Sequence, residues 1–209
     1  MSGSIASGER RHPGLNLHES DAHQADDSVM FGFWVFMMSD AVLFALLFSV
    51  YASVGANTAG GPGPHDVFKL RPAAQETLLL LLSSFTFGMA SLAMKHRRGL
   101  ALLQGMLGVT LLLGLGFLGM EVHDFVEMAG KGAVPRVSAF LSAFYALVPT
   151  HFLHVLIGCV WIAVMMVQVQ VFGLERITRT RLLRLGLFWH FLDIVWVMIF
   201  TLVFLRGLL

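Results

Sequence analysis

Residues 138–172 read SAFLSAFYALVPTHFLHVLIGCVWIAVMMVQVQVF, a stretch without a single Asp, Glu, Lys or Arg. A helix needs about 20 apolar residues to cross the hydrocarbon core of a bilayer, and this stretch exceeds that length. The alternation of apolar and polar residues expected of a barrel strand is absent. Because backbone groups in lipid must be hydrogen-bonded within the segment, we interpret the stretch as a membrane-spanning helix. Pro149 cannot donate to the carbonyl of Tyr145, which predicts a kink there.

Four more apolar segments accompany this one, at 30–54, 73–94, 100–120 and 185–205. Of the 209 residues, 56% are hydrophobic and 13% are charged. A soluble domain carries about 25% charged residues, so the composition excludes a water-soluble globular protein. The net charge of +1 supplies no basic field for nucleic acid. The sequence therefore predicts an all-α integral membrane protein with five transmembrane helices.

The ends of the segments predict an orientation. Residues 1–29 are polar and lack the apolar core of a signal peptide, so we expect a mobile cytoplasmic tail ahead of a membrane domain at 30–209. Lys and Arg concentrate on the cytoplasmic side of membrane proteins. The side of the tail holds nine of them and the opposite side five, which predicts a cytoplasmic N-terminus and a periplasmic C-terminus. The nine are Arg10, Arg11, Lys95, Arg97, Arg98, Arg176, Arg179, Arg181 and Arg184, and the five are Lys69, Arg71, Lys131, Arg136 and Arg206.

Three carboxylates fall inside the five predicted spans: Asp40, Glu76 and Asp193. No Lys or Arg lies in the same spans. An ionisable residue in hydrocarbon costs at least a few kcal/mol and is a functional candidate by default. Asp40 and Asp193 could equally be neutral acids that join two helices by hydrogen bonds. We expect Glu76 to have functional or regulatory weight, because its own helix offers only Gln75 and Thr77 as polar neighbours.

Two helical pairs of polar residues follow, His151 with His154 and His190 with Asp193. A spacing of three places each pair on one helix face. Three imidazoles and a carboxylate could bind zinc or non-haem iron. Hydrogen bonding between the two helices would use the same residues, and we favour that interpretation over a metal site. No catalytic residue, cofactor-binding residue or metal ligand is otherwise predicted in this chain.

Glycine is concentrated in the third segment, at Gly105, Gly108, Gly114, Gly116 and Gly119. Small residues let helix backbones approach closely in membranes. We therefore predict that this segment packs tightly against a neighbouring helix, either of this chain or of another subunit.

Several motifs together resemble subunit III of the haem-copper oxidases, over residues 31–209. They are GFWVFMMSD at 32–40, TAGGP at 58–62, Glu76-Thr77, GFLGME at 116–121, FLSAF at 140–144, THFLHV at 150–155 and FWHFLDIVW at 188–196. The last motif is highly specific. Five spans, in place of the seven of the mitochondrial type, favour the branch that serves cytochrome bo-type ubiquinol oxidases.

The resemblance implies a non-catalytic subunit of a proton-pumping ubiquinol oxidase in a bacterial inner membrane. The haem and copper would lie in subunit I, with subunits II and IV in the same complex. The helices would form two groups around a V-shaped cleft that holds phospholipid. The chain would support assembly, stability, oxygen access and proton supply to subunit I. Glu76 stands where the family has a membrane-embedded glutamate, and His151, His154, His190 and Asp193 would join helices.

Other functions remain open from the sequence. The same subunit could serve a cytochrome c oxidase. A stand-alone membrane metal enzyme could use His151, His154, His190 and Asp193. A small transporter could relay protons through Asp40, Glu76 and Asp193, although such folds usually contain internal repeats and none stands out here.

Overall fold

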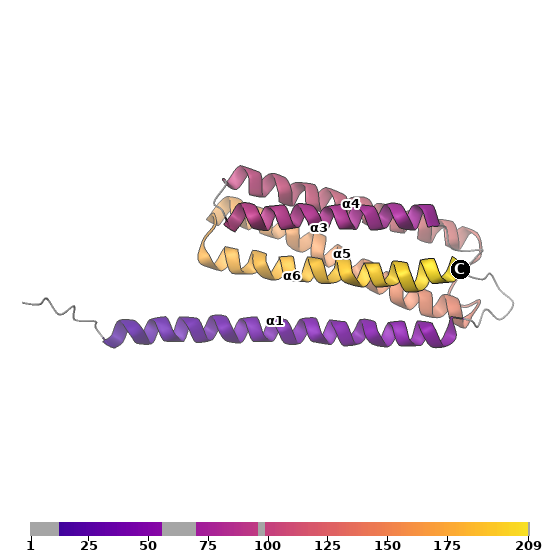
Figure 1. The fold of residues 1–209 in the computed structure, drawn as a ribbon, viewed down its shortest axis with the longest axis horizontal. Helices are drawn as coiled ribbons and strands as arrows, with labels where there is room; N and C mark the ends of the chain where they lie inside the picture. The colour runs from indigo at the N-terminus through magenta and orange to yellow at the C-terminus, as the bar shows by residue number, and fades with distance from the viewer. Residues whose placement is uncertain (1–12, 56–69, 96–98, 209) are drawn as a thin grey trace, which may run out of the picture. The chain divides into compact units, whose positions relative to one another are not determined.

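Every described segment that could span the membrane is helical. The computed structural model describes residues 13–55, 70–95 and 99–208, with side chains from Ser28 onward. The helices are α1 (Pro13–Val54), α3 (Leu70–Lys95), α4 (Leu100–Gly130), α5 (Ala139–Phe172) and α6 (Arg176–Ile199). A π-helical stretch, η1 (Phe200–Leu205), and the short α7 (Arg206–Leu208) complete the described chain (Figure 1).

Five of these helices are long and apolar enough to cross a membrane. Their spans are Ser28–Val54, Leu70–Lys95, Leu100–Gly130, Ala139–Phe172 and Arg176–Leu205. For the described residues, the prediction of an all-helical fold with five helices able to span a membrane is therefore confirmed. The last span continues from α6 into η1 without a break in helical structure.

Several helix ends differ from the expected ones. α1 begins at Pro13, so the backbone of residues 13–29 is helical although a mobile tail was expected there. α4 continues to Gly130, ten residues past the predicted end, and α6 starts at Arg176, nine residues early. Hydropathy marks the apolar part of a helix, whereas the helix itself extends as far as its backbone hydrogen bonds do. α5 matches its expected range and continues through Pro149.

The chain divides after Val42 into an N-terminal unit and a larger unit that begins at Leu43. The N-terminal unit contributes a single helix. In the larger unit, α3 packs against α4 and α6, and α5 packs against the same two helices (Figure 1). The last turns of α1 belong to this unit, where Phe44 contacts His154 with ring centroids 5.2 Å apart.

Large aromatic side chains fill the interior of the larger unit. Trp196 is fully buried and meets the ring of Phe117 edge to face at 4.7 Å between centroids. Trp189 lies between α4 and α5, where Gly114 and Gly158 leave room for its ring. A β-carbon on either glycine would lie 2.9 Å from a Trp189 ring atom. The indole nitrogens donate to α3, from Trp189 to Ser83 and from Trp196 to Thr77, both at 3.1 Å.

The predicted tight packing of the glycine-rich helix rests mainly on one residue. Gly114 is the close contact, while a β-carbon on Gly105 or Gly119 would meet nothing within 4 Å. Gly108 and Gly116 would make ordinary contacts at 3.7 and 3.8 Å. Within the described residues, the close approach of α4 to other helices of this chain therefore occurs at Gly114.

Candidate functional site

Glu76 is buried on α3, with 1% of its surface exposed. Its Oε1 atom makes no hydrogen bond within the described part of the chain. The adjacent Thr77 donates to the carbonyl of Ala73 at 2.7 Å and accepts from Trp196 at 3.1 Å, so its hydroxyl already has partners. The expectation that α3 offers Glu76 little polar support thus agrees with its surroundings in the larger unit.

A second acid, Glu121 on α4, is buried as deeply and was missed from the sequence. Its exposed fraction is 3%. The count of three intramembrane carboxylates was wrong, because α4 does not end at Met120. Buried positions of α4 recur at Phe117, Glu121 and Met128, which is helical spacing. That continued periodicity is the signal that would have identified Glu121.

The two buried acids interact across the α3–α4 interface. Glu121 experiences the charges of both Glu76 and Asp124, and Glu76 experiences that of Asp124. Three carboxyl groups from two packed helices therefore form one electrostatic group, which we call the acid cluster (Glu76, Glu121 and Asp124). Like charges repel strongly where the dielectric constant is low, so the charge of each of these three groups affects the other two.

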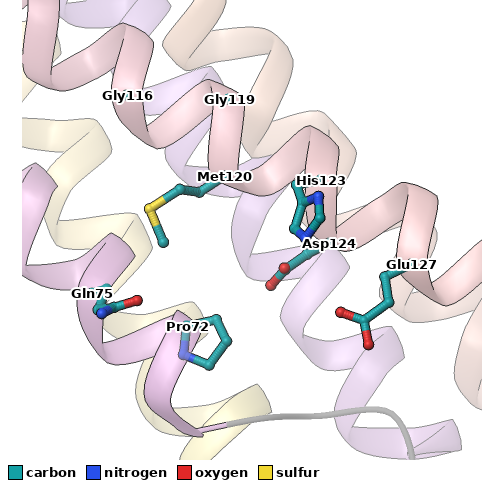
Figure 2. A pocket seen from close by; sticks show the side chains of 8 residues that line it. All are labelled: Pro72, Gln75, Gly116, Gly119, Met120, His123, Asp124 and Glu127. Atoms are coloured by element: carbon teal, nitrogen blue, oxygen red, sulfur yellow. The ribbon is translucent and has the colours of Figure 1, made fainter.

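A groove between α3 and α4 leads to the acid cluster. Its volume is about 490 Å³. Figure 2 shows the side chains of Asp124 and Glu127 extending from α4 toward the space beside α3. Asp124 thus belongs both to the groove and to the cluster, while Glu127 pairs with Lys131 at 2.7 Å. The lining residues are Pro72, Gln75, Gly116, Gly119, Met120, His123, Asp124 and Glu127.

Asp40 lies in the N-terminal unit, on α1. The hydroxyl of the preceding Ser39 donates to the carbonyl of Phe36 at 2.7 Å, within the same helix. Asp40 is inside the span Ser28–Val54, as the sequence predicts.

The histidines of α5 have different partners. His151 is fully buried, and its Nε2 donates to the carbonyl of Leu192 on α6 at 3.1 Å. His151 also lies against Trp196, at 5.2 Å between ring centroids. The Nδ1 of His154 instead donates to the carbonyl of Thr150 in its own helix at 2.7 Å. His151 therefore joins α5 to α6 by a hydrogen bond, whereas the hydrogen bond of His154 stays within α5.

His190 and Asp193 lie together on α6. His190 Nδ1 is hydrogen-bonded to Ser84 Oγ on α3 at 2.7 Å. Ser84 also contacts the carboxyl group of Asp193, whose Oδ1 has no hydrogen-bond partner among the described residues. This group connects α3 to α6 near the middle of both helices.

These four residues do not converge on one point. His151 and His154 bond to carbonyls, and His190 bonds to a hydroxyl. Within the described ranges, no group of three or more His, Cys, Asp or Glu is arranged to hold a metal ion. His151 and His190 therefore make hydrogen bonds between helices, whereas the hydrogen bond described for His154 does not, and the metal-enzyme alternative gains no support from this arrangement.

The fold and the acid cluster define a multi-pass membrane protein whose ionisable groups are enclosed between helices. The family described as cytochrome c oxidase subunit III matches residues 15–208. The cytochrome bo(3) ubiquinol oxidase subunit 3 of Pseudomonas putida is 47% identical over 187 residues, which cover 90% of each chain. The protein of that name from Pseudomonas aeruginosa is also 47% identical, over 93% of this chain and 98% of its own. The chain belongs to the cytochrome c oxidase subunit III family.

Two branches of this family are among the relatives. The quinol oxidase subunit 3 of Bacillus subtilis is 43% identical over 85% of this chain and 86% of its own. The cytochrome c oxidase subunit 3 of Bacillus sp. (strain PS3) is 41% identical over 85% of both chains. The family membership confirms the resemblance that the motifs indicated.

Proposed function

We propose that this chain is subunit III of a proton-pumping cytochrome bo-type ubiquinol oxidase in a bacterial inner membrane. The single observation that carries the proposal is the 47% identity to the Pseudomonas putida subunit 3 over 90% of the chain. The complex would oxidise ubiquinol and reduce oxygen to water. Haem and copper would reside in subunit I, and subunits II and IV would complete the assembly.

The role proposed for this chain is support of subunit I. Electron transfer would take place in subunit I. The chain would stabilise the assembly, with a cytoplasmic N-terminus, a periplasmic C-terminus and a phospholipid in a V-shaped cleft. It would also assist oxygen access and proton supply.

The acid cluster is the part of this chain that we assign to proton supply. Glu76 and Glu121 are buried, and Asp124 connects them electrostatically to the groove. A buried carboxyl group that exchanges protons through a partly exposed one can hold a proton near the membrane surface. Asp40 is a second buried-acid candidate, on α1.

Purification of the tagged chain in mild detergent tests the proposal. A larger haem-bearing polypeptide should accompany the chain, and the isolated complex should consume oxygen with ubiquinol. Purification of the chain alone, from cells that express the whole oxidase, would refute the proposal.

A cytochrome c oxidase is the second candidate, because the Bacillus sp. (strain PS3) subunit of that name is 41% identical. The same preparation decides between the two. Oxygen consumption with reduced cytochrome c and none with ubiquinol would favour this second candidate.

A further inference from the structure

Ser84, His190 and Asp193, which we call the polar triad, lie in the middle of two spanning helices. Ser84 Oγ is 2.7 Å from His190 Nδ1, and Ser84 also contacts the carboxyl group of Asp193. His190 lies halfway along the 30-residue span Arg176–Leu205. At 1.5 Å per residue it is about 20 Å from either end of that span. The polar triad is therefore at the depth of the hydrocarbon core of a bilayer.

The polar triad is not enclosed by the larger unit. Ser84, His190 and Asp193 are each partly exposed. His190 Nε2 has no hydrogen-bond partner among the described residues, and it is not one of the partnerless polar atoms that they bury completely. This ring nitrogen is therefore accessible from outside the larger unit. An imidazole nitrogen donates or accepts a hydrogen bond, and acyl chains offer no partner for either.

The exposed face of α5 provides a contrast within the same chain. Every exposed residue of α5 between Leu153 and Val167 is Leu, Ile or Val. Lipid tails are as apolar as leucine, so such a face suits contact with lipid. The seam between α3 and α6 instead presents an imidazole and a hydroxyl at the same depth. Ionisable residues inside a membrane almost always face other protein groups or water, so this seam is poorly suited to lipid.

The part of α3 beside the polar triad would let another helix approach closely. Gly88 follows Ser84 by one turn, and a β-carbon there would meet nothing within 4 Å. Ser91 continues the same stripe of α3 and is also partly exposed. Small residues and polar side chains are what spanning helices use to associate in membranes. Leu81 on α3 and Ile194 on α6 are exposed apolar residues that flank the polar triad.

We propose that the seam between α3 and α6 binds a transmembrane helix of another subunit, and that this helix presents a hydroxyl or amide side chain to His190 Nε2. The inference rests on the proposed function, which makes this chain one subunit of a complex. Hydroxyl and amide groups both donate and accept, so either satisfies the imidazole nitrogen. Gly88 allows the close approach, and Leu81 and Ile194 contact apolar residues of the incoming helix.

Site-specific photocross-linking in the intact oxidase tests the surface. The variant Ile194→p-benzoylphenylalanine places the probe beside the polar triad, and Val160→p-benzoylphenylalanine places it on the apolar face of α5. The two native residues are similarly exposed, at 63% and 58%. After irradiation of native membranes, mass spectrometry should find the probe at position 194 joined to a spanning segment of another subunit, within one turn of a polar residue. The probe at position 160 should be joined to lipid.

Two cross-linking results would overturn the proposal. One is that the probe at position 194 is joined to lipid alone. The other is that it is joined to a spanning segment that has no polar residue within one turn of the cross-link.

A set of substitutions separates the outward contact from the hydrogen bond inside the chain. His190→Leu removes Nε2 together with the bond to Ser84, whereas Ser84→Ala removes only that bond and keeps the imidazole. In detergent, His190→Leu should make this chain dissociate from the complex about three- to tenfold faster. Ser84→Ala should leave the rate nearly unchanged, and His190→Gln should restore part of the retention through its amide. Equal acceleration in His190→Leu and Ser84→Ala would overturn the proposal, because the internal bond would then explain the loss.

Failure of this surface and failure of the proposed function give different results. If the chain were not an oxidase subunit, no haem-bearing polypeptide would accompany it in any variant. If only the surface were wrong, the unchanged complex would still be purified with its activity, and the probe at position 194 would be joined to lipid alone.

Discussion

Replacement of Gly158 by alanine would test the packing of Trp189 directly. The new β-carbon would lie 2.9 Å from Cζ3 and 3.1 Å from Cε3 of the indole ring. The ring cannot move away, because Gly114 bounds its other edge and Ser83 accepts from its Nε1. Overpacking of a filled interior costs about 1–3 kcal/mol. Against this, alanine gains about 1 kcal/mol in helix propensity over glycine.

Gly105→Ala removes the propensity gain from the comparison. It makes the same chemical change in α4, where an added β-carbon meets nothing within 4 Å. The difference between the two variants should therefore equal the overpacking cost alone. If the overpacking cost is about 2 kcal/mol, the melting temperature of the Gly158→Ala variant should lie about 4–8 °C below that of the Gly105→Ala variant. The measurement is the thermal unfolding of the purified chain in mild detergent.

A second substitution separates the steric effect from a general loss of stability. Trp189→Phe reduces the size of the ring. It should therefore lower the free energy of unfolding less in the Gly158→Ala variant than in the unchanged chain. Equal melting temperatures for Gly158→Ala and Gly105→Ala would refute the close approach of the ring to α5.

The remaining predictions concern polar groups. Glu76→Gln should leave assembly largely intact and alter turnover or the rate of inactivation of the complex. The control is Glu127→Gln, which removes a carboxylate from a partly exposed ion pair. Unchanged turnover and inactivation in Glu76→Gln would end the functional assignment of Glu76. Trp196→Phe should lower the free energy of unfolding by about 1 kcal/mol through the lost bond to Thr77, and a Thr77→Val variant without such a loss would contradict this. A chelator should leave the melting temperature of the chain unchanged, and a lowered value would revive the metal-site alternative.

The five spans and the family could be predicted because the signals for both lie in consecutive residues of the chain. Uncharged runs such as 138–172 identify spanning helices without knowledge of any contact. The motif at 188–196 likewise identifies the family from consecutive residues. Helix ends were less predictable, since α4 and α6 extend into polar sequence where hydropathy gives no signal.

The positions of the polar side chains were less predictable. The sequence placed Glu121 after the end of the third apolar segment, yet α4 carries it into the interior. The pairing of His190 with Ser84 joins residues 106 positions apart, and no spacing rule relates them. The five glycines of the third segment were equivalent in the sequence, but only Gly114 lies against the Trp189 ring.

The number of spanning helices, the family and the candidates Asp40, Glu76 and Asp193 thus followed from the amino-acid sequence, whereas Glu121 did not. Transfer of a segment into lipid depends on that segment's own length and polarity, so hydropathy is sufficient for this part. The burial of Glu121 on α4, and the presence of Arg179 rather than Arg181 in the lining of a cavity, followed only from the folded structure. These contacts depend on how neighbouring helices are rotated and shifted against one another, which is set by the packing of many side chains at once.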